Sequence, residues 1–562
     1  SQENYSENQL AAHALFSAAW VLQQLKEYKR SAESYKQFIV RFSESEFVST
    51  AAIRAGECYF ALRDARKTID HLVRFRSHIT RDDEKAEADY LLGESYLSLG
   101  DYPNALFSYE SFLKKSPDNH LVRAVKYSRG WTFLKEMNYE RAMQIFAELQ
   151  QGTDDVAQGS LFRKGVAQKL AGDRMGAMET FNACFEANTP FSDDALYEIG
   201  LLFYEEKDFH GARTAFRELL REHPATNLAV QALRMRGESE VALSDYEAAL
   251  ASFQSVDARK DLLPDFEIDV EFQICWTLVK LKRYAEAAEA YAVFVQKHPT
   301  YDKVDEAYFW MGEAYFFSGN IGRAEECYVT VITKYPESKK IPEALYGLGW
   351  TYFKTGNCKE AITSLEEAIQ MQRLAPDVQF DALLRTGGCY FDAKNYVAAG
   401  GAYRTIARRF PEKVASPFIL CRLAFCNGEI GDYDDAMDMY EDAMKRWPQS
   451  QFIDDALFGK GEVYVKAQDD KKAIEEFRFL IKQFPSSEFV PQSYLYIGDA
   501  YMKLNQPKRV AASLEEFLKI HPASSLAGEA KVKLHKTYLA LGLKAKAAKL
   551  QSEIEARAKE VQ

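Results

Sequence analysis

The sequence predicts an all-α protein, an α-solenoid of about fifteen stacked helix pairs, on three observations. A small residue, most often Gly, recurs about every 37 residues along the whole chain. Ala stands twelve residues after it in twelve of the fifteen copies, and a large apolar residue follows four residues later. We call the recurring small residue the anchor. The anchors are Ala19, Gly56, Gly93, Gly130, Gly165, Gly200, Gly237, Cys275, Gly312, Gly349, Gly387, Ala424, Gly461, Gly498 and the degenerate His535.

Each copy is predicted to be two short amphipathic helices, because its apolar residues are spaced three and four apart. Turns such as "SLGDYPNA" carry Gly, Asp and Asn where the chain reverses. The anchor and the Ala are expected to be small because the two helices approach closely there. The large apolar residue is expected to fill the space between neighbouring pairs. Pro closes eight of the copies, and the Ser or Thr after it is expected to cap the next helix.

Composition bounds the class of protein. A hydrophobic content of 47% and a charged content of 27% over 562 residues indicate a well-packed chain. The net charge of −12 argues against a nucleic-acid binder. No run of 18 apolar residues occurs, so no membrane span is predicted. The start "SQENYSENQL" has no Met and no apolar signal region, so we expect a processed or trimmed chain. The first copy also has no polar cap comparable to that of the last copy, which indicates further sequence before Ser1.

No catalytic, metal or cofactor site is predicted. The eight cysteines form no CxxC pair and have no His at metal spacing, so they are interpreted as small buried apolar residues. Gly-rich phosphate loops, G-x-S-x-G and H-E-x-x-H are absent from the sequence. The acidic pairs Asp193–Asp194 and Asp454–Asp455 are interpreted as helix starts that complement the helix dipole.

The pattern Gly-x-x-Tyr…Ala-x-x-x-Phe…Pro resembles the tetratricopeptide repeat over essentially the full chain. The resemblance implies a right-handed superhelix that binds other proteins in a concave groove. Two features depart from the family pattern. The usual Trp four residues before the Gly is replaced, for example by Tyr308 and Tyr494, and the period is 37 rather than 34. The longer form is similar to repeats of bacterial envelope proteins, of the outer-membrane assembly lipoprotein and Tol–Pal coordinator type.

The groove is expected to be lined by two positions of each first helix, three before and one after the anchor, which lie on one helix face. They carry aromatic residues and carboxylates, which suit an extended or helical peptide with apolar anchors and some Lys or Arg. The predicted partner-binding residues are Trp131, Trp276, Trp350, Tyr90, Tyr127, Phe309, Tyr346, Glu57, Glu94, Glu238 and Glu313. The alternative is that this ladder only packs against adjacent helices. The three tryptophans are the better candidates, since the repeat pattern has no evident structural demand for Trp there.

Three domains are predicted: an array over residues 1–258, a second array over 259–524, and a Lys-rich capping repeat over 525–562. The longer connection "ARKDLLPDFEI" predicts a bend near residues 256–268. The capping repeat has an alternative use as a basic contact to an acidic partner or lipid surface.

The predicted function is a non-enzymatic scaffold that assembles or positions a bacterial cell-envelope complex, in the periplasm or envelope. Its partners would be other proteins, through a peptide segment or an envelope machinery component. Two alternatives stay open. One is a cytoplasmic adaptor or regulator, which the unpaired cysteines favour. The other is an array that binds cell-wall glycans, which the Tyr and Trp residues favour.

Overall fold

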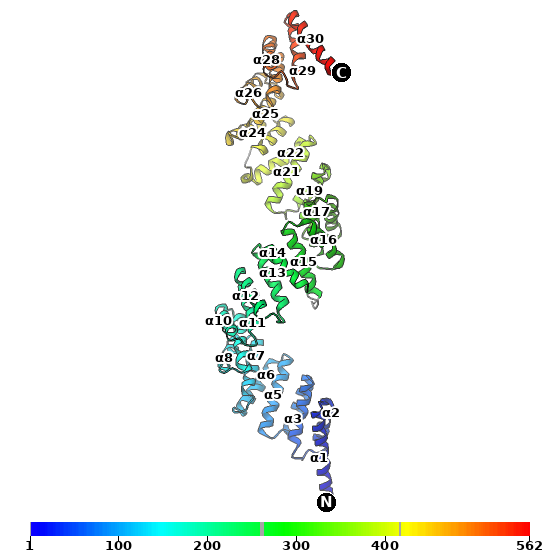
Figure 1. Ribbon diagram of the computed structural model, residues 1–562, viewed down its shortest axis with the longest axis vertical. Coiled ribbons are helices and arrows are strands. Elements are labelled where there is room, and N and C mark those ends of the chain that lie inside the picture. Colours follow the sequence, from blue (N-terminus) through cyan, green and yellow to red (C-terminus); the bar gives the residue numbers. More distant parts are fainter. Residues whose placement is uncertain (1, 259–263, 415–416, 562) are drawn as a thin grey trace. The chain divides into compact units, whose positions relative to one another are not determined.

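The computed structural model describes residues 2–258, 264–414 and 417–561. These residues form 30 α-helices and two short 3₁₀ helices, with no strand among them. The α-helices follow one another as fifteen consecutive pairs, each with its anchor in the first helix. Figure 1 shows the helical ribbon coloured along the sequence. The predicted all-α solenoid of helix pairs is therefore confirmed.

The chain divides into two compact units, Ser1–Thr277 and Leu278–Gln562, and α15 contains the boundary. The helices of the first unit are α1 Gln2–Gln24, α2 Tyr28–Arg41, α3 Val48–Ala61, α4 Ala65–Arg74, η1 Arg76–His78, α5 Asp82–Ser98, α6 Tyr102–Lys115, α7 Val122–Lys135, α8 Tyr139–Leu149, α9 Asp155–Leu170, α10 Arg174–Glu186, α11 Ser192–Glu205, α12 Phe209–Glu222, α13 Ala229–Ala242, α14 Tyr246–Asp257 and α15 Pro264–Lys280.

The helices of the second unit are α16 Tyr284–Lys297, α17 Val304–Ser318, α18 Ile321–Lys334, α19 Ile341–Lys354, α20 Cys358–Gln370, α21 Pro376–Asp392, α22 Tyr396–Arg409, η2 Pro411–Lys413, α23 Phe418–Ile430, α24 Tyr433–Arg446, α25 Ile453–Lys466, α26 Asp470–Gln483, α27 Val490–Lys503, α28 Pro507–Ile520, α29 Ala527–Ala540 and α30 Lys544–Val561. The three predicted domains stay a prediction. The predicted bend at 256–268 lies partly outside the described residues, which leave out 259–263.

The core of the first fourteen pairs is built on the anchor and the large apolar residue sixteen positions later. From Tyr35 to Leu514, the buried residues at this later position are at most 2% exposed. A Cβ placed on the anchor Gly200 would lie 2.5 Å from the ring of Phe216, so only Gly leaves room for that ring. The ring also faces the next pair, because a Cβ on Gly347 would lie 2.6 Å from Tyr328 of the preceding copy. The large apolar residue therefore fills the space between neighbouring pairs, as predicted, and also the space between the two helices of its own pair.

The turn inside each pair has a residue with positive φ, and in most copies an Asp or Asn follows it as the N-cap residue of the second helix. Lys207 has φ 63° and Gly100 has φ 77°, each one residue before the cap. The carboxylate of Asp208 accepts a hydrogen bond from the backbone N–H of Gly211 at 3.0 Å, which satisfies one of the unpaired donors at the start of α12.

The loop between pairs differs from the prediction. α12 ends at Glu222, two residues before Pro224, as expected. The Ser that follows the Pro does not cap the next helix, so that expectation is wrong. Ser338 Oγ accepts from the N–H of Lys340, and Lys340 is itself the N-cap residue of α19, with no side-chain cap. The Ser closes a turn inside the loop, and the helix begins after it.

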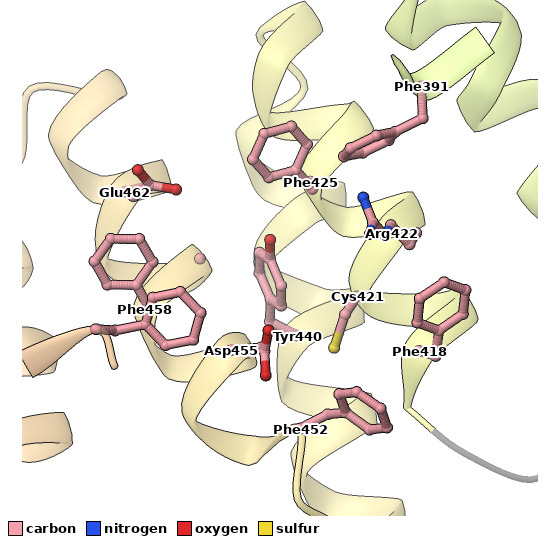
Figure 2. Close-up of a pocket in the computed structure, with 12 residues that line it drawn as sticks. Phe391, Phe418, Cys421, Arg422, Phe425, Tyr440, Phe452, Asp455, Phe458 and Glu462 are labelled. Atoms are coloured by element: carbon pink, nitrogen blue, oxygen red, sulfur yellow. The ribbon is translucent and has the colours of Figure 1, made fainter. Parts of the chain in front are cut away.

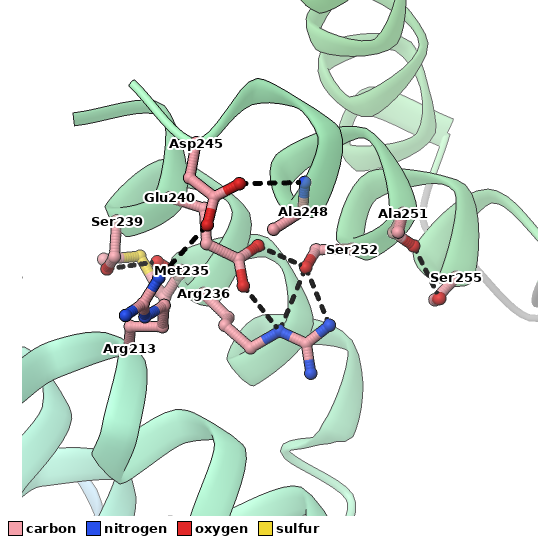
Figure 3. Close-up of polar contacts among 10 residues, drawn as sticks. All are labelled: Arg213, Met235, Arg236, Ser239, Glu240, Asp245, Ala248, Ala251, Ser252 and Ser255. Carbon is pink, nitrogen blue, oxygen red and sulfur yellow. Dashed lines mark hydrogen bonds and ion pairs between the residues drawn. The ribbon is translucent and has the colours of Figure 1, made fainter. Parts of the chain in front are cut away.

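Polar contacts occur both between neighbouring pairs and within one pair, as Figure 3 shows for α12 to α14. Arg213 of α12 forms an ion pair with Asp245, the cap of α14, at 3.2 Å. Glu240 is 4% exposed, and its carboxylate accepts from Ser252 Oγ at 2.5 Å and lies 3.4 Å from Arg236 Nε. Buried charge is thus matched by partners within the chain.

Candidate functional site

The predicted partner-binding residues all lie on first helices, but the structure does not bring them into one cluster. They are distributed over α3, α5, α7, α13 and α15 of the first unit and α17 and α19 of the second. Tyr346 and Trp350 do meet, since Trp350 Nε1 donates to the Tyr346 hydroxyl at 2.8 Å. Their role in partner binding stays a prediction.

Two of the three tryptophans have a structural use that the repeat pattern does not reveal. The guanidinium carbon of Arg385 lies 3.4 Å from the ring centre of Trp350, and that of Arg163 lies 4.1 Å from the ring centre of Trp131. Each Arg stands two residues before the anchor of the next copy. The tryptophans therefore pair with a cation of the following repeat. Trp276 makes an edge contact with Tyr246 at 6.2 Å between ring centres.

The four predicted carboxylates also have partners within the chain. Glu94 accepts from the Tyr109 hydroxyl at 2.8 Å, and Glu313 accepts from the Tyr328 hydroxyl at 2.6 Å. In both cases the tyrosine is the large core residue of the same copy. The remaining two form ion pairs, Glu57 with Arg54 at 2.8 Å and Glu238 with Arg234 at 3.0 Å.

The remaining aromatic residues of the predicted groove are at least half-buried. Tyr127 makes an edge contact with Phe146 at 5.8 Å, and Phe309 is 6% exposed beside Tyr328. Tyr90 packs against the core clusters on both sides of α5. These side chains contribute to packing whether or not they also contact a partner.

A cavity of about 380 Å³ opens in the second unit, between α23 and α25 (Figure 2). Its walls are mostly aromatic, with three charged side chains and one thiol. The lining residues are Phe391, Phe418, Cys421, Arg422, Phe425, Tyr440, Phe452, Asp455, Phe458, Gly459, Glu462 and Phe489.

The cavity lies at the two helix positions that were predicted to line the groove, three residues before and one after the anchor. It lies in copies twelve and thirteen, which contain none of the predicted partner-binding residues. Cys421 and Phe458 stand three residues before their anchors, and Phe425 and Glu462 stand one after. Nine of the fifteen copies have an aromatic residue at the earlier position, where this copy has the small Cys421. The missing ring explains the hollow. The sequence signal that marks it is therefore a small residue at an otherwise aromatic position.

The Tyr440 hydroxyl is a polar group that the fold leaves unused. Tyr440 is 2% exposed, and its hydroxyl has no hydrogen-bond partner among the residues that the structure describes. Tyr109 and Tyr328 occupy the same position in their copies and donate to a Glu one residue after the anchor. Here that residue is Phe425, so the acceptor is missing.

Asp455 is a second polar group of the cavity wall. It lies in the first turn of α25, and within the described ranges its carboxylate has neither an ion pair nor a side-chain hydrogen bond. Burial raises its pKa and neighbouring Asp454 adds to the rise, while a hydrogen bond from its own backbone N–H and the charge of Arg422 partly offset it. Glu462 is engaged, since the Tyr496 hydroxyl donates to it at 2.8 Å.

Arg422 and Cys421 complete the wall. The guanidinium of Arg422 lies 4.1 Å from the ring centre of Phe391 and 5.3 Å from that of Phe418. Burial raises the pKa of the Cys421 thiol to about 12, so it is neutral at physiological pH. Among the described residues, no group of three or more His, Cys, Asp or Glu is placed to hold a metal ion.

The helix pairs and their recurring core define a helical repeat protein. Two family models described as tetratricopeptide repeat match the sequence, one over residues 165–226, 197–262, 311–378, 346–413 and 428–488, the other over 87–119 and 492–524. These matches cover more than half of the chain, which therefore belongs to the tetratricopeptide repeat family. Such repeats typically bind other proteins, which supports a protein–protein interaction scaffold. No helix in the described part of the chain is long and apolar enough to cross a membrane.

Several solved structures match the chain over about half of its length or nearly all of it. The anaphase-promoting complex hetero-tetramer Cut9–Hcn1 matches at 15% identity, 96% coverage of both chains and a TM-score of 0.26. Naa15/Naa10 bound to HypK-THB matches at 12% identity, 97% of this chain, 94% of the other and a TM-score of 0.31. A tetratricopeptide repeat protein from Parabacteroides merdae matches at 15% identity, 48% of this chain, 98% of the other and a TM-score of 0.29. A comparison with curated proteins found no match.

Proposed function

We propose that the protein is a non-enzymatic scaffold that binds a peptide segment of a partner in the hollow between α23 and α25. The observation that carries this proposal is a cavity of about 380 Å³ at the groove register, lined by seven aromatic side chains. Pockets that bind ligands typically have roughly 300–1,000 Å³ and mostly apolar walls with a few polar groups. A single large side chain of a partner would gain most of its binding energy by leaving water there.

The cavity is suited to binding because its walls are pre-organised. Phe458 stacks on Phe489 with 4.6 Å between ring centres, and Arg422 is held between two rings. Side chains fixed by such contacts lose little conformational freedom when a partner binds. Most of the lining residues lie within helices, and Phe452 and Phe489 directly precede α25 and α27, so the helices fix the positions of the walls.

We further propose that the scaffold acts in a bacterial cell-envelope complex, in the periplasm. The similarity of the 37-residue repeat to envelope proteins supports this setting. A cytoplasmic adaptor and a cell-wall glycan-binding array are the alternatives. Sedimentation of the protein together with purified peptidoglycan would identify the glycan-binding array, whereas a peptide scaffold is expected to stay in solution.

The test is affinity capture from the soluble and envelope fractions of the native organism, with wild type and Cys421→Phe. This substitution restores the ring that most copies carry and fills the hollow. The matched control is Val532→Phe, which adds a ring at the same register of the last copy, at a residue 40% exposed. Circular dichroism and the thermal midpoint establish that both variants fold.

We expect wild type and Val532→Phe to retain a common set of proteins that Cys421→Phe loses. Retention of every partner by folded Cys421→Phe would overturn the peptide site. Recovery of envelope components supports the envelope setting. Recovery of cytoplasmic proteins only would overturn that setting while leaving the scaffold role.

A further inference from the structure

We infer that the hollow receives an arginine side chain of the partner, an inference that rests on the proposed peptide site. The chain itself contains a completed version of the same arrangement. In copies ten and eleven, Arg385 stacks on Trp350 and forms a bidentate ion pair with Asp381, with Nε–Oδ2 at 2.6 Å and a second nitrogen–Oδ1 distance of 3.0 Å.

The hollow repeats this arrangement without its arginine. Trp350 stands one residue after the anchor of copy ten, and Asp381 stands six residues before the anchor of copy eleven. In copies twelve and thirteen, the same two positions are occupied by Phe425 and Asp455. The residue that corresponds to Arg385 is Gly459. The ring and the carboxylate are therefore both present, and both line the cavity (Figure 2).

Tyr440 packs against Gly459, since a Cβ there would overlap the Tyr440 hydroxyl oxygen, so an arginine can enter the cavity only from a partner. The ammonium of Lys466 lies 5.4 Å from the ring centre of Phe425.

Two polar groups of the cavity wall match what a guanidinium requires. Asp455 forms no ion pair within 4.0 Å and no side-chain hydrogen bond among the described residues, although Arg422 lies near enough to lower its pKa. A carboxylate can accept two parallel hydrogen bonds from one guanidinium. The Tyr440 hydroxyl, 2% exposed and without a described partner, provides a further acceptor. The aliphatic part of an arginine would pack on rings such as Phe452 and Phe458.

Charge favours the same occupant. The cavity wall holds Arg422 against Asp455 and Glu462, and aromatic faces add negative potential. Arg422 is at the other wall over Phe391 and forms no ion pair with Asp455 within 4.0 Å. An acidic side chain would meet two carboxylates, whereas an arginine would neutralise one of them.

The test uses the purified full chain and synthetic peptides with one fixed central residue and randomised flanks. The fixed residue is Arg, citrulline, Lys or Glu. Citrulline has nearly the shape of Arg but no charge, so the pair isolates the ion pair from the packing. Binding is measured by fluorescence anisotropy. We expect the Arg peptides to bind about tenfold more tightly than the citrulline peptides, with Lys between them, since Lys cannot form the bidentate contact.

Asp455→Asn provides the matched protein variant, because it removes the charge and keeps the shape. We expect it to bind Arg and citrulline peptides equally. Asp454→Asn removes the same charge one residue away, outside the cavity wall, and is expected to keep the preference.

The outcomes separate this inference from the proposed function. If wild type binds Arg and citrulline peptides equally, or prefers Glu peptides, the inference that the cavity binds arginine is overturned, while the proposed peptide site stands. If Asp455→Asn still prefers Arg over citrulline peptides, the arginine binds at another place on the protein and the inference fails. If no peptide set binds, or if Cys421→Phe binds all sets as wild type does, the peptide site itself fails.

Discussion

At the scale of single residues, the repeat is held together by a contact between a glycine and a ring. The sequence pattern predicted a small anchor and a large apolar residue, and both are where it placed them. It did not predict that they touch each other, because spacing along one helix pair does not reveal which side chain enters which gap. Tyr440 illustrates the same limit, since only the structure shows that its hydroxyl has lost the Glu that serves Tyr109.

Gly200→Ala should destabilise the protein by about 1–3 kcal/mol, because the new Cβ would lie 2.5 Å from the fully buried Phe216 ring. Gly388→Ala is the matched control. It is also a helical glycine, but a Cβ there meets nothing within 4 Å, so the better helix propensity of Ala should stabilise by up to about 1 kcal/mol. Urea unfolding followed by circular dichroism measures both. Equal effects of the two substitutions would contradict the ring contact.

His71 should make stability fall in acid. It is 5% exposed, its Nε2 lies 2.9 Å from the carbonyl oxygen of Ala52, and burial lowers its pKa to about 4. Between pH 6.5 and 4 the unfolded chain binds a proton that the folded chain does not, so stability is lost as pH falls, by about 1.4 kcal/mol per pH unit. We expect His71→Gln to be less stable than wild type at neutral pH but to lose less stability between about pH 7 and pH 4.5. Parallel urea unfolding curves at the two pH values test this, and an equal loss in both proteins would refute it.

At the scale of elements, helix pairing and helix ends were largely readable from the sequence. Pro marks the end of α12 and Asp208 marks its start, as the turn chemistry predicts. The serine cap was wrong because Ser338 satisfies an N–H inside the loop rather than at the helix end. A hydroxyl can serve either role, and the local sequence does not distinguish them.

The turn inside each pair offers a stabilising substitution. Lys207 adopts φ 63°, which costs a side-chain-bearing residue about 1 kcal/mol relative to Gly. We expect Lys207→Gly to raise the free energy of unfolding by about that amount. Gly172 occupies the same turn position in another copy with φ 85°, so Gly172→Lys should lower it similarly. Opposite signs in calorimetry would confirm the prediction, and a loss of stability in Lys207→Gly would exclude it.

At the scale of the whole molecule, the groove register was predictable but the copy that is hollowed was not. The ladder of aromatic and acidic residues looked equally suited to binding in many copies. What distinguishes them is a relation between two consecutive copies. Arg385 stacks on Trp350 of the preceding copy, whereas Gly459, at the same position, has no side chain to place beside Phe425 and packs against Tyr440 instead. A comparison of each copy with its neighbour, rather than with the consensus, would have found it.

The chain should also respond to damage locally. Substantial contacts join each described helix only to helices one or two places along the sequence, so stability is expected to be a sum of short-range contributions. Gly200→Ala, which strains α11 against α12, should therefore speed backbone hydrogen exchange in α9 to α14. Exchange in α23 to α27, which surround the hollow, should stay at the wild-type rate, and so should binding of the Arg peptides. Hydrogen exchange followed by mass spectrometry measures both regions in one experiment. Faster exchange at α23 to α27 would show that the array unfolds as a single cooperative block.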